Sequence, residues 1–282
     1  MSGDLLRVEN LRVAFPSPRG MVQAVNGVSF SAGREKTGIV GESGSGKSVT
    51  GRSVLRLLPP YTSVQTDSIS FDGCELTRLS ERQMRTIRGR RISMVMQDPK
   101  YSLNPVRSVG RQINESCAIH LHLGHRAAKR RTLEMLEAVR IREPERVYDL
   151  YPHEVSGGMG QRIMIAMMLV SEPDMLIADE PTSALDVTVQ LQVLAILDDI
   201  VRERGMGLLF ISHDLSLVST FCDRVIIMYG GRIMEEVAAA DLYKSTHPYT
   251  RGLLNCLPKI EGGKRRLSIL HREDAWLHGG KR

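Results

Sequence analysis

The chain has 282 residues, of which 42% are hydrophobic and 25% are charged, with a formal net charge of +6. This composition is typical of a globular protein with one large domain or two small ones. Only 5% of the residues are aromatic, which disfavours a base-stacking nucleic-acid surface, and the mildly basic balance suits an anionic ligand or a membrane surface without selecting either.

The first segment is predicted to be rich in strands. Apolar residues alternate with polar or small ones in 11–15, and 28–30 and 69–71 follow similar short patterns. Turn-forming residues at 16–20 interrupt these patterns, and Asp72-Gly73 predicts a further turn. We therefore expect an N-terminal antiparallel β region.

Residues 41–48 fit G-x-x-x-x-G-K-[ST], the loop that wraps the phosphates of a nucleotide. Its glycines allow a sharp turn that brings main-chain N–H groups inward, because no Cβ blocks the way. Lys47 can place a charge between the β- and γ-phosphates, and the Ser48 hydroxyl can ligate Mg²⁺. The loop lies between a predicted strand, 37–40, and a predicted helix, 49–58, whose dipole favours anions. A chance match in a Gly/Ser-rich turn is the weaker alternative in this context. The predicted nucleotide-binding residues here are Gly41, Glu42, Ser43, Gly44, Ser45, Gly46, Lys47, Ser48 and Val49.

The middle of the chain, from about 103 to 151, is predicted to be helical, since apolar residues recur at helical spacing in 133–139. It contains the densest basic stretch, 125–131. A solvated helix face is the favoured interpretation of that stretch.

Residues 155–161 open a helix with Ser156-Gly157-Gly158 at its start. Exposed N–H groups, a hydroxyl and the positive end of a helix dipole form a second phosphate-binding arrangement. A simple N-cap is the alternative, because Ser is favoured there. Two such helix starts could serve two nucleotides, or two ends of one nucleotide across a dimer. The longest apolar run, 163–170, is far shorter than the ~20 residues that a membrane span needs.

An apolar strand, 175–178, ends in Asp179 and Glu180. In a P-loop enzyme the first carboxylate holds Mg²⁺, and the second can orient and activate the attacking water. Adjacent residues at the end of a strand point to different sides, so one carboxylate can face the metal and the other the γ-phosphate. An acidic strand end without a role is the alternative, and the phosphate loop in the same chain weakens it.

Strands and helices alternate in the second half of the chain. Residues 208–211 form a second buried-strand candidate, and 189–201 are apolar at helical spacing. This alternation predicts a parallel sheet covered on both faces. Residues 224–234, with Gly230-Gly231 between their two arms, predict a late hairpin. The polar, basic tail after Leu257 is interpreted as a peripheral extension.

These motifs resemble the ATPase subunit of an ABC transporter. The P-loop, the Ser156-Gly157-Gly158 signature, the Asp179-Glu180 strand end, Ser183-Ala184-Leu185-Asp186 and Ser212-His213-Asp214 occur in that family's order and cover most of the chain. The signature is far more specific than the P-loop, which many NTPases share. The resemblance implies an α/β fold: a P-loop NTPase core with a mixed sheet covered by helices, an N-terminal antiparallel β region and an inserted α-helical subdomain. The implied boundaries are one ABC ATPase domain at 1–257, with its core at 1–97 and 168–257, a helical subdomain at 98–167, and a short basic extension at 258–282.

The resemblance also implies roles for single residues. Gln97 matches the glutamine that contacts Mg²⁺ and water, and Glu180 matches the catalytic base. His213 matches the switch histidine that contacts the γ-phosphate, Asp186 the loop that touches the opposite subunit, and Phe15 the aromatic residue that stacks on adenine. Without the resemblance, Gln97 is a polar strand end, His213 a structural histidine and Phe15 a core residue. The implied catalytic residues are Lys47, Gln97, Glu180 and His213, and the implied Mg²⁺ ligands are Ser48, Gln97 and Asp179.

Two positions depart from the family pattern. Met159 stands where the signature usually has Gln, although Met is common there in the peptide-importer branch. Gly160 stands where that branch usually has Arg, and Gly weakens a helix start by about 1 kcal/mol relative to Ala. Main-chain N–H groups and Ser156 can still bind phosphate, so we expect activity to persist.

Two further segments resemble the dipeptide, oligopeptide and nickel importer ATPases. One is His-Pro-Tyr-Thr-Arg-Gly-Leu-Leu at 247–254, and the other is Gln97-Asp98-Pro99 followed by 102–105. Many members of this branch carry a cysteine-rich C-terminal segment associated with an iron–sulfur site. Only Cys256 lies in that region, so no cluster is expected. The chain has no C-x-x-C pair, and its four cysteines are interpreted as reduced thiols.

The resemblance thus implies a subunit that hydrolyses ATP with Mg²⁺ to power an ABC importer. Di- or oligopeptides are the favoured solutes, and nickel or another small solute is the alternative. The implied partners are a second ATPase subunit, homologous or identical, two transmembrane permeases and an extracytoplasmic solute-binding protein. The chain would then be peripheral at the cytoplasmic face of the plasma membrane and meet the membrane only through the permeases. No nucleic-acid partner is expected.

Two other classes stay open. An ABC-type ATPase of DNA repair or translation is less favoured, because no long coiled coil is inserted and only one P-loop is present. A pure nucleotide-binding module is disfavoured by the presence of Glu180 and His213.

Overall fold

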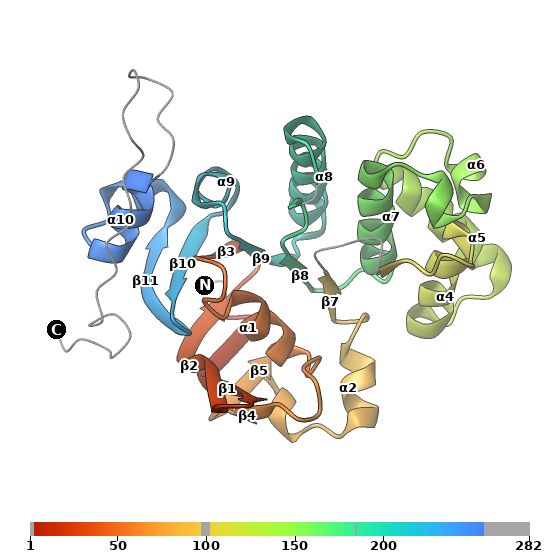
Figure 1. Cartoon of the computed structure of the whole chain (residues 1–282). Helices are drawn as coiled ribbons and strands as arrows, with labels where there is room; N and C mark the ends of the chain where they lie inside the picture. The colour runs from red at the N-terminus through yellow and green to blue at the C-terminus, as the bar shows by residue number, and fades with distance from the viewer. Residues whose placement is uncertain (1–2, 97–101, 184, 257–282) are drawn as a thin grey trace, which may run out of the picture. The chain divides into compact units, whose positions relative to one another are not determined.

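The computed structural model describes residues 3–96, 102–183 and 185–256 (Figure 1). These residues form two compact units: a first unit of 3–78 with 209–256, and a second unit within 79–208. Gln97 and the predicted extension at 258–282 lie outside the described residues. The predicted domain boundaries stay a prediction.

An antiparallel sheet forms the N-terminal part of the first unit, as predicted. Its strands follow the order β2-β1-β5-β6, and β4 also pairs with β1. Asp72 and Gly73 have φ angles of 48° and 75°, the left-handed geometry of a two-residue hairpin turn. The elements are β1 (Leu6–Ser17), β2 (Gly20–Ala32), β4 (Ser63–Gln65), β5 (Ser68–Phe71), β6 (Cys74–Glu75) and the short helix η1 (Leu76–Arg78).

A mixed sheet with strand order β11-β10-β3-β9 completes the first unit. Strand β10 runs parallel to β3 and antiparallel to β11, which confirms the predicted late hairpin. A Cβ added to Gly38 in β3 would lie 2.3 Å from Val218 in α9, so this glycine lets the helix pack closely on the sheet. The elements are β3 (Lys36–Val40), α1 (Lys47–Val54), β9 (Gly207–Ser212, of which 209–212 belong to this unit), α9 (Leu215–Phe221), β10 (Arg224–Tyr229), β11 (Arg232–Ala238), η3 (Ala239–Lys244) and α10 (Pro248–Cys256).

Helix α1 is shorter than the predicted helix, which extended to Leu58. Arg56 adopts a φ of 51°, and two hydrogen bonds close the helix end: Arg56 N donates to Ser53 O, and Leu57 N donates to Arg52 O, each at 3.0 Å. This pattern is a Schellman motif. The prediction was wrong because the left-handed position holds arginine where glycine is the usual signal.

The second unit combines helices with two parallel strands, β7 and β8, whose residues are all buried. Helices α4, α5, α6 and α7 gather into one group, which confirms the helical character predicted for the middle of the chain (Figure 1). The elements are α2 (Glu81–Ile87), β7 (Ile92–Val95), α4 (Val109–Leu121), α5 (His125–Ala138), α6 (Pro144–Asp149), η2 (Pro152–Glu154), α7 (Gly157–Leu169), β8 (Met175–Asp179) and α8 (Val187–Arg204).

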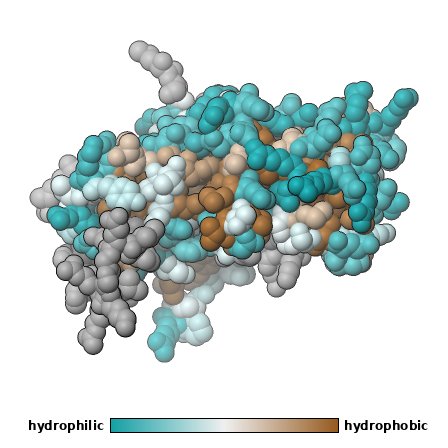
Figure 2. All heavy atoms as spheres, turned by 90° about the horizontal axis from the view of Figure 1, so that it is seen from above, coloured by the Kyte–Doolittle hydropathy of each residue, from teal (hydrophilic) through white to brown (hydrophobic). Residues whose placement is uncertain are grey.

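Hydrophilic residues cover much of the face shown in Figure 2, and hydrophobic residues form groups among them. The exposed apolar side chains of the second unit include Val106, Val187 and Leu191. Among the described residues, no helix is both long enough and apolar enough to span a bilayer.

Candidate site for nucleotide binding and hydrolysis

The P-loop joins β3 to α1, and neighbouring main chain fixes its shape. A Cβ added to Gly41 would lie 2.1 Å from the Met228 carbonyl oxygen, and one added to Gly46 would lie 2.5 Å from the Ala24 carbonyl oxygen. Gly44 and Gly46 also have φ angles of 79° and 95°, which side chains rarely adopt. The loop therefore needs glycine both for space and for backbone conformation.

Lys47 is buried within the loop. Its Nζ donates hydrogen bonds to the carbonyl oxygens of Gly41 and Glu42, each at 2.8 Å. These two carbonyls direct the ammonium group into the loop, where it can meet the phosphates of a nucleotide.

The turn between β10 and β11 supports the loop from outside. Gly231 N donates to the Ser45 carbonyl oxygen at 3.1 Å, and a Cβ on Gly231 would lie 2.7 Å from the Ala24 carbonyl oxygen. The sequence signalled only a hairpin at Gly230-Gly231. Its contact with the P-loop depends on the sheet order and has no local sequence signal.

His213 lies in the short loop between β9 and α9. Asp214 holds this loop, because its N donates to Ser212 Oγ and its Oδ1 accepts from Leu217 N, both at 3.0 Å. The exposed His213 lines a cavity of about 450 Å³ together with Gly41 and Glu42 of the P-loop. The first unit thus brings His213 and the P-loop to one cavity.

Phe15 is half-buried on β1, opposite Val22 of β2. The same strand, β2, supplies the Ala24 carbonyl against which Gly46 packs. The hairpin that carries Phe15 is therefore joined to the P-loop through β2. Its contact with adenine stays a prediction.

In the second unit, β8 ends at the buried Asp179, and Glu180 follows with a φ of 48°. Ser183 stabilises this turn, because its N and Oγ donate to the Glu180 carbonyl oxygen at 3.3 and 3.2 Å. Strand alternation, the reason predicted for the separation of the two carboxylates, does not apply to Glu180, since the strand has already ended. A left-handed non-glycine residue is costly, and such residues cluster at functional sites.

Ser156 caps α7, and its Oγ accepts a hydrogen bond from Met159 N at 3.3 Å. We call Ser156, Gly157 and Gly158 the signature turn. A Cβ on Gly157 would meet nothing within 4 Å, whereas one on Gly158 would lie 2.6 Å from Val189 Cγ1. The signature turn is therefore open on one side and tightly packed against α8 on the other.

Asp186 caps α8, and its Oδ1 accepts from Val189 N at 3.0 Å. Val189 thus touches Gly158 with its side chain and Asp186 with its main chain. This contact brings the starts of α7 and α8 together, a pairing that the sequence did not indicate. The caps also show that Ser156 and Asp186 have structural roles.

The ABC transporter family model matches residues 25–183, more than half of the chain. The chain belongs to the ABC transporter family. It is 50% identical over 263 residues to a probable peptide ABC transporter ATP-binding protein of Sinorhizobium fredii, covering 92% of this chain and 78% of the relative. It is 48% identical over 260 residues to a dipeptide transport ATP-binding protein of Bacillus subtilis, covering 91% and 78%.

The solved structures agree on the fold. A dimeric ATP-binding cassette in a post-hydrolysis state with ADP and Pi superposes with a TM-score of 0.75 at 23% identity, covering 83% of this chain and 98% of that chain. The predicted α/β P-loop fold is confirmed, and this ABC subunit is an ATPase.

Its predicted site residues divide between the units. Lys47, Ser48, His213 and Phe15 belong to the first, and Ser156, Asp179, Glu180 and Asp186 belong to the second.

Proposed function

We propose that this ABC subunit hydrolyses ATP to drive a peptide importer. The observation that carries the proposal is the P-loop, in which Gly41 and Gly46 pack against main chain and two carbonyls direct Lys47 inward. The relatives described above carry names of peptide and dipeptide transport ATP-binding proteins, which supports a peptide as the solute.

The P-loop geometry fits a triphosphate. The main-chain N–H groups at the start of α1 and the Lys47 ammonium supply positive potential, and Phe15 would stack on the adenine. Ser48 and Asp179 are oxygen donors of the kind that Mg²⁺ prefers. When bound, Mg²⁺ would neutralise charge on the phosphate oxygens, and Gln97, outside the described residues, would complete its ligands.

Glu180 would orient the attacking water and accept its proton. His213, beside the P-loop, would donate a hydrogen bond to the γ-phosphate, and Lys47 would stabilise the charge that develops on the transferred group. The role of the protein in this chemistry is positioning and electrostatics. That role explains why Lys47 and Glu180 are each held by their local main-chain structure.

The signature turn would bind the γ-phosphate of a nucleotide held by a second ATPase subunit. Its exposed Ser156 and the open side of Gly157 support this assignment. Val187 and Leu191 on α8, exposed by 72% and 60%, give an apolar surface next to Asp186 that suits such a contact. Two nucleotides would close the dimer, and phosphate release would reopen it.

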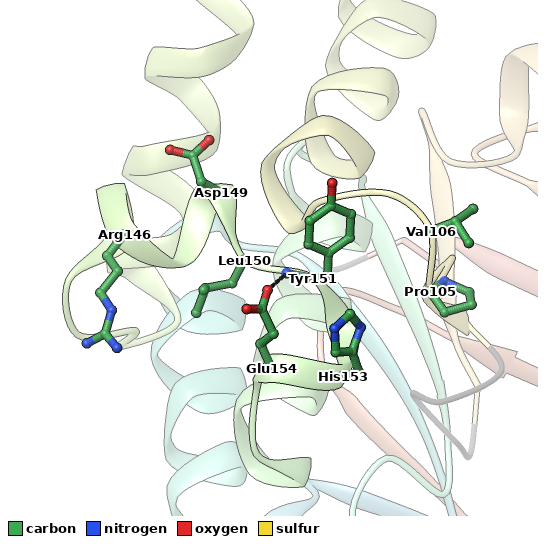
Figure 3. Close-up of a pocket in the computed structure, with 8 residues that line it drawn as sticks. All are labelled: Pro105, Val106, Arg146, Asp149, Leu150, Tyr151, His153 and Glu154. Carbon is green, nitrogen blue, oxygen red and sulfur yellow. Dashed lines mark hydrogen bonds between the residues drawn. The ribbon is translucent and has the colours of Figure 1, made fainter.

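The helical group of the second unit would receive a cytoplasmic segment of a permease. A shallow pocket of about 840 Å³ lies between the loop after 102 and the α6–η2 region (Figure 3). The rings of Tyr151 and His153, which line this pocket, stack with their centroids 5.8 Å apart, and the apolar side chain of Val106 is 78% exposed. Two permeases and an extracytoplasmic binding protein would complete the importer, and the permeases would hold this chain at the cytoplasmic face of the membrane.

Solute uptake tests the proposal. The chain would be co-purified with two permeases and a second ATPase subunit, reconstituted in liposomes with a solute-binding protein, and supplied with ATP. We expect uptake of labelled di- or oligopeptides that stops in a Glu180→Gln variant. Uptake of Ni²⁺ without peptide uptake would contradict the peptide assignment, and ATP hydrolysis with no uptake of either would contradict the importer.

A further inference from the structure

We propose that Arg162 is a positioning residue that prepares the Ser156 hydroxyl to donate to phosphate. This inference rests on the proposed function of the signature turn. Arg162 lies on α7, one helical turn after Gly158. Its Nε donates to the Gly158 carbonyl oxygen at 3.3 Å, and its Nη1 donates to the Arg140 carbonyl oxygen at 2.9 Å. The guanidinium group therefore joins the first turn of α7 to the chain just after α5.

Arg162 is a half-buried cation without a carboxylate partner. In the described part of the chain, its polar contacts are the two carbonyl oxygens, and no Asp or Glu forms an ion pair with it. Burial lowers the pKa of Arg162, and the charge of Arg142 lowers it further. Two cations therefore lie near the positive end of α7, and an anion at the signature turn would offset this unfavourable arrangement.

Arg162 is linked to Ser156 through one peptide group. The carbonyl of Gly158, which accepts from Arg162, belongs to the same amide as the N–H of Met159. That N–H donates to Ser156 Oγ at 3.3 Å. A cation on the carbonyl polarises the amide and strengthens its N–H as a donor, since linked hydrogen bonds reinforce one another.

The consequence falls on the hydroxyl of Ser156. Once Oγ accepts from Met159 N, its own O–H is directed elsewhere, and the open side of the signature turn is where a phosphate oxygen could accept it. Both contacts measure 3.3 Å, which is long for a hydrogen bond, so each can shorten when an anion binds. We call the hydrogen bonds that link Arg162 to Ser156 through the Gly158–Met159 amide the relay. Met159 and Gly160 offer no polar side chain to phosphate, so the relay strengthens the one side-chain donor of the signature turn, the Ser156 hydroxyl.

The test is a double-mutant cycle on the assembled importer. We would measure the ATP concentration for half-maximal hydrolysis in Arg162→Met, Ser156→Ala and the double variant. We expect Arg162→Met to raise that concentration about fivefold when Ser156 is present, and less than twofold in the Ser156→Ala background. Equal effects in both backgrounds, or no effect in either, would overturn the relay.

Controls separate the relay from folding and from the proposed function. Arg126→Met removes one exposed arginine of α5 and should leave hydrolysis unchanged. Arg162→Lys keeps the charge but cannot donate to both carbonyl oxygens in the same geometry, so it should raise the ATP concentration for half-maximal hydrolysis by less than Arg162→Met does. If Arg162→Met does not fold, Arg162→Lys takes its place in the double-mutant cycle. A fluorescent ATP analogue should bind the separate subunit equally well in all variants. If Ser156→Ala alone changes nothing, the proposed role of the signature turn fails; if only Arg162→Met is silent, the relay alone fails.

Discussion

The P-loop and the signature turn both present a helix start to phosphate, but the chain stabilises them in different ways. Contacts with β2, β10 and the Gly231 turn enclose the P-loop, and Lys47 is held within it. The signature turn is enclosed on one side only, where Gly158 meets Val189. The difference is consistent with the proposal that the P-loop holds the nucleotide within one subunit, while the open side of the signature turn meets the nucleotide of a second subunit.

Glu180→Gln should give the largest effect and separates chemistry from binding. Removing the base should lower turnover by about 10²–10³-fold, while ATP binding at the P-loop persists. Phosphate release measures turnover, and a fluorescent ATP analogue measures affinity. Turnover close to that of the wild type would show that Glu180 is not the base.

Gly41→Ala tests the enclosure of the P-loop. The added Cβ would lie 2.1 Å from the Met228 carbonyl oxygen, so the loop must move. We expect a loss of about 2–3 kcal/mol in unfolding free energy and loss of ATP binding. Gly157→Ala is the matched control, since its Cβ would meet nothing within 4 Å. Equal destabilisation by both, measured by urea unfolding, would show that the P-loop is no more tightly enclosed than the open side of the signature turn.

Gly158→Ala tests the closed side of the signature turn. Its Cβ would lie 2.6 Å from Val189 Cγ1, and we expect a loss of about 1–2 kcal/mol with impaired hydrolysis. Adding Val189→Ala should restore part of the stability, because it removes the opposing methyl groups. If Val189→Ala lowers the unfolding free energy of the Gly158→Ala variant by as much as it lowers that of the wild type, the contact with Val189 is not what destabilises Gly158→Ala.

Glu75→Gln should give the smallest effect and concerns strand β6 of the antiparallel sheet. Burial would raise the pKa of Glu75, but hydrogen bonds from Ser68, Thr77 and the main-chain N–H of Ile69 lower it to about 2. The carboxylate therefore stabilises the fold above its ordinary pKa of 4.5, and this contribution is lost as the pH falls towards 2. Because Glu75 is partly exposed, we expect about 1 kcal/mol at pH 7. Melting curves from pH 7 to pH 3 should converge for the two proteins, and a constant gap would contradict the assignment.

Much of the fold followed from local patterns, because the strands, the P-loop and the cap at Ser156 each have a signal within a few residues. Three features did not. Arg56 ends α1 without the usual glycine, Glu180 leaves β8 in a left-handed conformation, and Gly231 reaches the P-loop through the sheet order. In each case the deciding interaction is a main-chain conformation or a contact between distant segments, neither of which has a local sequence pattern.

The roles of Phe15 and His213 depended on the resemblance to the ABC family. An aromatic residue on a strand or a histidine after one has structural explanations of its own. The structure adds that His213 shares a cavity with the P-loop, and that Phe15 lies on a hairpin that supports it. These placements make both roles testable by single substitution.

In the proposed dimer, the signature turn of one subunit acts on the nucleotide held by the P-loop of the other subunit. Mixing Lys47→Ala with Ser156→Ala subunits tests this arrangement most directly, because a symmetric dimer of either variant carries its substitution at both sites. A mixed dimer of two copies of this chain keeps one of its two sites intact if the sites are shared. When equal amounts of the variants exchange subunits at random, half of the dimers are mixed, so hydrolysis should recover to about a quarter of the wild-type rate. Hydrolysis no higher than the average of the two separate variants would show that the sites are not shared between subunits.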